Sequence, residues 1–411
     1  MSVQPSSSTA GKASGWWQRP RLHDEEERHE HRKVTWMELF YDLVFVVAVA
    51  QISHHLAEHV TWQGAGEFVL LFVAVWWVWI TGTVYNERFE SRGLEARMFA
   101  FLQIVGVAAL AFFAHDGAGH NATGFALSYV GASLLILCFW FRGAVHNPPF
   151  RPVMRGYLLG FLPSHALWIA SIWVDAPWKH LLWAVGLFGT FLTPLLTLNI
   201  QARLPRWSTS KMPERFGLFV IIVLGEGIVG SINGLAVHEH LDGHLAVVSL
   251  LAIAVPFCLW WIYFDFVARR VPRPDRFNVY FWGTIFHMPL VLGIAASGAG
   301  LLNVVARSSI AALPTEVQAL LGTALGCSVA SIGLIETRLA RTPHEPTHPV
   351  TSPLLKLGTG GAIAALGLLA PPMHTYWFLL PILGLMAINM VYGTWVWFRN
   401  PEHHSETQYV G

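Results

Sequence analysis

Twelve long apolar runs constrain this chain more than any other feature of its sequence. A helix needs about 20 mostly apolar residues to cross the roughly 30 Å hydrocarbon core of a bilayer. Runs of that length follow one another along most of the chain. We therefore predict an all-α integral membrane protein with transmembrane helices at 36–57, 65–86, 97–114, 124–142, 155–174, 180–200, 215–237, 245–267, 278–303, 315–336, 355–371 and 375–398.

The composition agrees with a multi-pass membrane protein. Only 12% of the residues are charged and 54% are hydrophobic, whereas about 25% are charged in an ordinary soluble protein. The net charge of +1 indicates no nucleic-acid partner. We expect the lipid bilayer and an unidentified ion or small solute as partners, no cofactor and no metal site, and we leave homo-oligomer formation open.

The basic residues predict the orientation of the spans. Lys and Arg collect in cytoplasmic loops of membrane proteins. With twelve spans and both termini inside, every one of the 26 basic residues except Lys179 and Arg307 falls on the inner side. A wrong number of spans would scramble this alternation, so we predict that both termini are cytoplasmic.

An internal similarity divides the chain into two halves. Residues 38–49, ELFYDLVFVVAV, align with 214–225, ERFGLFVIIVLG, and VWWVWI at 75–80 aligns with LWWIYF at 259–264. An even number of spans in each half gives both halves the same orientation. We predict a flexible cytoplasmic tail over 1–34, six-helix repeats over 35–200 and 201–398, and a short cytoplasmic tail over 399–411.

The same segments resemble a known family. VTWMELFYDLVFVVAVAQISHHL, WWVWITGTVYNERFE, PERFGLFVIIVLGEGIVG and WWIYFDF are similar to the low temperature requirement A family of bacterial membrane proteins. The resemblance spans about 34–398 and implies a multi-pass protein of the bacterial cytoplasmic (inner) membrane. The family is named for a growth phenotype in the cold, and the name brings no substrate or reaction.

A more distant similarity concerns endolysosomal potassium channels. These have two six-helix repeats whose first helices carry Arg followed by Phe-Ser-Asp. Phe40-Tyr41-Asp42 occupies the comparable place in the first half, whereas the second half has Phe216-Gly217-Leu218 and no acid there. This similarity keeps a passive cation channel open as an alternative.

Four ionisable residues within the predicted spans are candidates for a functional path. At 1.5 Å per residue, Asp42 falls about 10 Å beyond the cytoplasmic entry of its span, and Glu226 falls near the middle of the membrane. Asp265 lies in the last turn of its span, and His287 lies near the midplane shortly before Pro289. Charges at such depths usually face a wet cavity or pair with one another. We predict that Asp42, Glu226, Asp265 and His287 form an ion or proton path, in which Asp42 and Glu226 face each other between the halves.

Glu226 stands out among these residues. The segment VIIVLGEGIVGSING places glycines on both sides of it and no basic residue within two turns. By contrast, Asp42 and Asp265 can pair with loop arginines such as Arg88 or Arg269. Three further residues are predicted to support the path, namely Glu38, Glu214 and Gln51; the two glutamates can instead pair with Arg32, Lys33 or Arg215 near the basic face.

Histidines form a second group on the predicted outer side. The loops HHLAEH, residues 54–59, and HEHLDGH, residues 238–244, combine imidazoles with carboxylates, a combination that suits zinc, nickel or copper. We assign no metal site there, because the sequence shows no evident HxxxH geometry on one helix face. A pH-responsive surface is the alternative interpretation.

The sequence favours transport over catalysis. It contains no phosphate-binding loop and no GxSxG motif, and its glycine-rich segments lie in apolar helices. We therefore expect no enzyme activity and predict a transporter that couples an ion or small solute to protons. A passive cation channel and a non-transporting structural or sensory protein are the alternatives.

Overall fold

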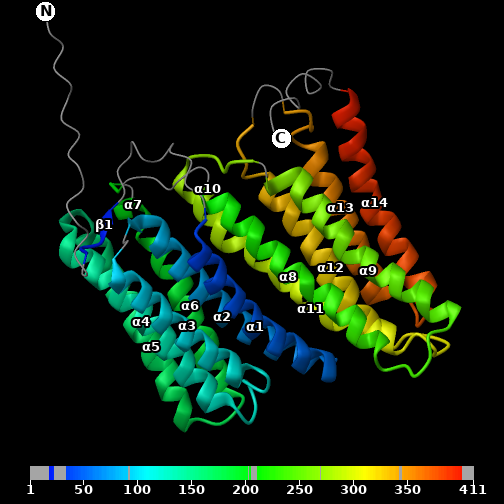
Figure 1. Cartoon of the computed structure of the whole chain (residues 1–411), viewed down its shortest axis with the longest axis horizontal. Coiled ribbons are helices and arrows are strands. Elements are labelled where there is room, and N and C mark those ends of the chain that lie inside the picture. Colours follow the sequence, from blue (N-terminus) through cyan, green and yellow to red (C-terminus); the bar gives the residue numbers. More distant parts are fainter. Residues whose placement is uncertain are drawn as a thin grey trace, which may run out of the picture.

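The fold is a bundle of long helices (Figure 1). The computed structural model describes residues 18–22, 34–90, 93–201, 203–204, 211–268, 270–341 and 345–399. In the first half the elements are β1 (Arg21–Leu22), α1 (Trp36–Glu58), α2 (Trp62–Arg88), β2 (Phe89–Glu90), α3 (Leu94–Ala114), α4 (Ala122–His146), η2 (Pro148–Phe150), α5 (Arg151–Ala170), η3 (Ser171–Trp173), α6 (Trp178–Leu196) and α7 (Leu198–Gln201).

The second half continues with a similar series of helices. Its elements are α8 (Lys211–Leu235), α9 (Gly243–Tyr263), η4 (Phe264–Ala268), α10 (Arg276–Tyr280), η5 (Phe281–Phe286), α11 (His287–Ala306), α12 (Thr315–Glu336), α13 (Thr351–Leu369) and α14 (Thr375–Arg399).

The predicted all-α multi-pass fold is confirmed. Eleven helices in the described ranges are long and apolar enough to cross a membrane, and each coincides with a predicted span. The remaining predicted span, 155–174, corresponds to α5, which is a 20-residue helix. It is less apolar than the others because Arg151, Arg155 and His165 lie along it.

The predicted span 278–303 is not one regular helix. It consists of α10, the π-helical turn η5 and α11. Pro289 lies just after η5 and has no backbone N–H to donate to the preceding turn. A π-helical turn in this place is the kind of local adjustment that accommodates proline within a membrane helix.

The first helix joins the two halves. Helices α1–α7 gather on one side of Figure 1 and α8–α14 on the other. Helix α1 contacts α2 and α3 of its own half and also α8 and α11 of the other half. The predicted pair of six-helix repeats stays a prediction. The contacts of α8 with α9 and α11 parallel those of α1 with α2 and α3.

One end of the bundle carries most of the basic loops, and we call it the basic end. There α1, α8 and α13 begin and α2, α12 and α14 end. Part of the predicted N-terminal tail packs at this end, because Arg21 and Leu22 of β1 pair antiparallel with Glu90 and Phe89 of β2. Residues 1–17, 23–33 and 400–411 of the predicted tails lie outside the described part of the chain.

Small residues bring helices α12 and α13 into backbone contact. A Cβ atom added at Gly360 would lie 2.7 Å from the Gly326 carbonyl oxygen and 2.8 Å from the Ala330 nitrogen. Gly367 meets Gly322 in the same way. Such close approach is a common way for helices to associate inside a membrane.

We predict that Gly360→Ala destabilises the protein by about 1–3 kcal/mol, the usual range for overpacking. The added methyl group would clash with backbone atoms of α12, so the two helices must move apart. Thermal unfolding in detergent measures this effect. Gly361→Ala is the matched control, because no atom lies within 4 Å of its added Cβ; equal unfolding temperatures for the two variants would contradict the prediction.

Candidate functional site

A buried ion pair connects α1 and α8 near the basic end. Arg215 lies 2.9 Å from Asp42 Oδ1 through its Nη2 and donates from Nε to Asp42 Oδ2 at 3.3 Å. Both side chains are almost fully buried, with exposures of 1% and 0%. Charged groups removed from water need such paired contacts, and the two-point geometry is the strong form for arginine and carboxylate. This contact, which we call the inter-half ion pair, therefore fixes α1 against α8.

Neighbouring groups complete this network. Trp79 Nε1 of α2 donates to Asp42 Oδ1 at 2.8 Å. Glu38 lies 2.8 Å from Lys211 Nζ and 3.6 Å from Arg215 Nη1. Glu38 also accepts a hydrogen bond from the Thr35 backbone N–H at 2.9 Å and so closes a capping box at the start of α1.

Aromatic rings enclose the inter-half ion pair. The guanidinium of Arg215 lies 5.8 Å from the centroid of the Tyr41 ring and 6.0 Å from that of the Trp79 ring. Trp79 stacks on Phe219 with ring centroids 4.2 Å apart, and Phe216 packs on its edge. The pair is thus held in an apolar surrounding where its electrostatic attraction is strong.

Glu226 lies elsewhere, in a small pocket between α1, α8 and α11. The pocket, which we call the Glu226 pocket, has a volume of ≈ 10 Å³, about the space that one water molecule needs. Ser53 and His54 of α1 line it together with Gly298 of α11. Glu226 is half-buried. It makes no hydrogen bond or ion pair with any residue in the described ranges.

The Ser53 hydroxyl is a second unsatisfied group at the Glu226 pocket. It is buried and has no hydrogen-bond partner among the described residues. A hydroxyl can both donate and accept, and a carboxylate accepts only. Together with the half-buried His54 side chain, these groups can hold a proton, a water molecule or a small cation.

Glycines bring the helix backbones together at the Glu226 pocket. A Cβ at Gly230 would lie 2.2 Å from the Gly298 carbonyl oxygen, and a Cβ at Gly298 would lie 2.8 Å from the Glu226 carbonyl oxygen. The backbone contact with α11 is made by Gly230, one turn after Glu226. Of the two glycines that flank Glu226, a Cβ at Gly225 would meet no atom within 4 Å and a Cβ at Gly227 would lie 3.2 Å from Pro256 of α9.

We predicted that Asp42 and Glu226 face each other, but in the structure they do not. Ser53 of the Glu226 pocket follows Asp42 on the same helix by 11 residues, about 16 Å along its axis. Asp42 instead pairs with Arg215, and the predicted alternative partner Arg88 donates to Gln201 at 3.1 Å. The two acids therefore occupy different depths of the bundle.

Neither Asp265 nor His287 lines the Glu226 pocket. Asp265 is exposed and accepts a hydrogen bond from Trp261 Nε1 at 2.7 Å. His287 is fully buried, donates from Nδ1 to the Trp282 carbonyl at 2.6 Å and lies 3.2 Å from the Tyr263 hydroxyl through Nε2. These contacts satisfy His287, link it to the irregular turn η5 through Trp282 and link it to α9 through Tyr263.

The three predicted supporting residues are dispersed. Glu38 belongs to the ion network of the basic end and contacts Arg215, one of the partners named from the sequence. Glu214 is exposed, and its carboxylate accepts a hydrogen bond from the Val34 N–H at 3.4 Å. Gln51 is half-buried on α1, two residues before Ser53.

A second buried network escaped the sequence analysis. Lys356 Nζ lies 2.9 Å from Glu336 and 3.4 Å from the centroid of the Phe266 ring, and it is fully buried. Arg270 contacts Glu336 at 3.4 Å and Glu345 at 3.3 Å. The sequence places these residues at span ends, where solvated charges are expected, and gives no sign that they meet.

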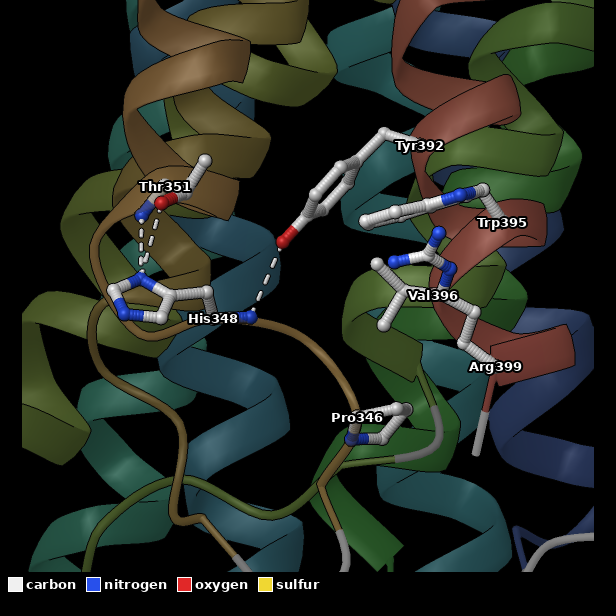
Figure 2. A pocket seen from close by; sticks show the side chains of 7 residues that line it. All are labelled: Pro346, His348, Thr351, Tyr392, Trp395, Val396 and Arg399. Atoms are coloured by element: carbon white, nitrogen blue, oxygen red, sulfur yellow. Dashed lines mark hydrogen bonds between the residues drawn. The ribbon is translucent and has the colours of Figure 1, made fainter. Parts of the chain in front are cut away.

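A larger hollow lies at the basic end. Its volume is ≈ 410 Å³, and Figure 2 shows Tyr392, Trp395 and Arg399 extending from α14 beside His348 and Thr351. The Tyr392 hydroxyl accepts from the His348 N–H at 3.1 Å, and Thr351 N–H donates to His348 Nδ1 at 3.2 Å. The hollow is away from the inter-half contacts of α1.

The histidines differ from the expectation in one respect. His55 and His59 are four residues apart at the end of α1, and their ring centroids are 4.5 Å apart. The segment HHLAEH therefore contains an HxxxH pair, His55 and His59, whose rings meet, contrary to the expectation from the sequence.

Comparison with known proteins confirms the family resemblance. Residues 33–392 match the model of the family described as bacterial low temperature requirement A protein. An uncharacterized protein of Rhizobium meliloti (strain 1021) is 26% identical over 316 residues, which are 67% of this chain and 70% of that protein. No solved structure matches the chain.

We predict that Arg215→Gln destabilises the protein by about 3–5 kcal/mol, because it leaves the buried Asp42 carboxylate uncompensated. The double variant Asp42→Asn/Arg215→Gln should lose less than Arg215→Gln alone, since it leaves no unpaired charge at Asp42. Denaturation in detergent measures both losses, with Arg307→Gln at an exposed position as the control. The single variant Asp42→Asn completes the comparison. If the losses of stability from Asp42→Asn and Arg215→Gln add up to the loss in the double variant, the two residues are not energetically coupled and the prediction is wrong.

Proposed function

We propose a transport function for this chain, which belongs to the bacterial low temperature requirement A family. The protein moves an ion or a small solute across the bacterial cytoplasmic membrane and couples this movement to protons at Glu226. Both termini and the basic end lie at the cytoplasmic face in this proposal, in keeping with the distribution of Lys and Arg.

The observation that carries the proposal is the unpaired carboxyl group of Glu226 inside the bundle. A charge within a membrane is expensive unless it is paired or hydrated. Glu226 has no charged partner in the described ranges, so it must be protonated, hydrated or bound to a cation. The unsatisfied Ser53 hydroxyl beside the same pocket adds a second group suited to that task.

The position of the Glu226 pocket supports coupling to movement. Residues of α1 from one half and of α8 and α11 from the other line the pocket. Any displacement of α1 relative to α8 and α11 changes the contacts of Glu226. A protonation that favours one arrangement of the halves therefore shifts the balance between them.

The packing at the inter-half ion pair argues against a permanently open channel. A channel needs a hydrated path through the bundle. Asp42 and Arg215 are sealed among Trp79, Phe216 and Phe219 nearer the basic end. This closed segment on one side of the Glu226 pocket fits a transporter that alternates between two arrangements of the halves better than it fits an open channel.

One observation favours the structural alternative. The inter-half ion pair holds α1 and α8 together and satisfies Asp42 completely, so Asp42 has a sufficient structural explanation. Glu226 has no such explanation. The two acids thus distinguish the hypotheses, because only Glu226 is free to exchange a proton or a cation.

We predict that Glu226→Gln abolishes proton-coupled flux while the protein stays folded, because an amide cannot release a proton. Purified protein in liposomes is given opposing gradients of protons and of Na⁺ or K⁺, and internal pH and membrane potential are followed with dyes. Glu316→Gln is the control, since Glu316 is an exposed acid at the start of α12.

The remaining outcomes separate the alternatives. Wild-type flux that persists in Glu226→Gln would exclude the proposed role of this residue. A cation current without proton movement would indicate a channel. No flux under any of these gradients would favour the structural or sensory function.

A further inference from the structure

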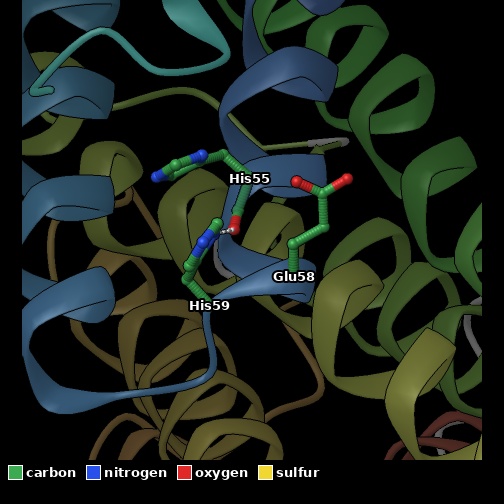
Figure 3. A group of neighbouring side chains, drawn as sticks. All are labelled: His55, Glu58 and His59. Carbon is green, nitrogen blue, oxygen red and sulfur yellow. Dashed lines mark hydrogen bonds between the residues drawn. The ribbon is translucent and has the colours of Figure 1, made fainter. Parts of the chain in front are cut away.

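A cluster of imidazoles and carboxylates lies at the end of α1 opposite the basic end. One ligand atom from each of His55, Glu58 and His59 lies within 4.8 Å of the others. Figure 3 shows His55 and Glu58 on the last turn of α1 and His59 directly after it. The HxxEH spacing is one that metal-binding segments use, and here it brings the His55 and His59 ring centroids to 4.5 Å from each other.

The connection between α3 and α4 brings a third imidazole. The ring of His115 is 5.5 Å from that of His55, and its Nε2 lies 3.4 Å from the Glu58 carboxylate. On α2, the Glu67 carboxylate lies 3.9 Å from His55 Nε2. Three separate segments therefore converge on one place.

The ring of His59 is oriented like that of a metal ligand. Its Nδ1 lies 3.2 Å from the His55 carbonyl oxygen (Figure 3). A carbonyl can only accept, so this contact puts the proton on Nδ1 and leaves the lone pair on Nε2. Metal-binding histidines commonly use a backbone carbonyl in this way to fix their tautomer.

The corresponding histidines of the second half are arranged differently. His238 Nε2 lies 3.0 Å from the Val305 carbonyl, and His244 Nε2 lies 2.9 Å from the Ser308 carbonyl. Those nitrogens are occupied by the backbone. In the cluster at the end of α1, the rings of His55 and His59 instead lie 4.5 Å apart, and each offers a ligand atom within 4.8 Å of one from Glu58.

We propose that His55, His59, His115 and Glu58 bind one divalent transition-metal ion, with Zn²⁺ as the ion of choice. Three imidazoles and one carboxylate form a four-ligand shell of the kind that zinc uses. Donor atoms in such a shell are roughly 3.4 Å apart. The exposed side chains of Glu58 and His59 can close the remaining distance by rotation.

Metal binding would tie the end of α1 to the α3–α4 connection. His54, the neighbour of His55, lines the Glu226 pocket, so the ion would hold the segment of α1 beside that pocket. This site does not depend on the transport proposal, because it needs only the ligands and not a proton at Glu226.

The test is Zn²⁺ binding by the full chain in detergent. Protein purified without a polyhistidine tag and stripped with a chelator is titrated with Zn²⁺ by calorimetry, and the retained metal is counted by elemental analysis. We expect wild type to bind one equivalent that His59→Ala and His115→Ala weaken at least about tenfold. Zn²⁺ should also raise the unfolding temperature of wild type and not of these variants.

His120→Ala is the matched control, because His120 is an exposed histidine of the same connection outside the cluster. It should bind Zn²⁺ like wild type. Both test positions are at least partly exposed, and unfolding of the metal-free variants checks that they fold. Absence of binding by wild type, or equal binding by wild type and both variants, would overturn the proposal. Cobalt offers a second readout, since a four-coordinate site gives it intense visible absorption and hydrated Co²⁺ does not.

Discussion

The buried contact between Asp42 and Arg215 is the interaction that most constrains this structure. Either residue without the other would be an unpaired charge in an apolar bundle, so the packing of α1 and the packing of α8 depend on each other. The acid comes from the first helix of one half and the base from the first helix of the other. In the internal alignment, Asp42 is opposite Leu218 and Arg215 is opposite Leu39. The halves are therefore complementary in charge at the point where their sequences differ.

The spans were predictable because a bilayer imposes a length and a composition that each segment must meet by itself. All twelve predicted spans are helical in the structure, including the glycine-rich α13, although the span 278–303 is interrupted by η5. The exact position of the π-helical turn before His287 was not predictable from the sequence. Pro289 indicates a local disturbance, but the contacts of His287 with Trp282 and Tyr263 decide its form.

The sequence was less informative about the site. It singled out Glu226 through its flanking glycines, and the structure places Glu226 between three helices with no partner among the described residues. It could not show that Asp42 meets Arg215, because partners across a bundle depend on helix rotation and depth, which hydropathy does not encode. The buried ion pair between Lys356 and Glu336 was not predicted, for the same reason. The pair His55 and His59 was different, since its four-residue spacing was visible in HHLAEH.

The backbone contacts in the second half have a thermal consequence. Helices α8 and α11 meet at Gly230 and Gly298, and α12 and α13 meet at Gly326 and Gly360. Association of this kind rests on van der Waals contact between backbones and not on the release of water. The hydrophobic effect weakens as temperature falls, but direct contact does not. The cohesion of these helix pairs should therefore persist in the cold, when the core of a water-soluble protein would already have lost part of its driving force.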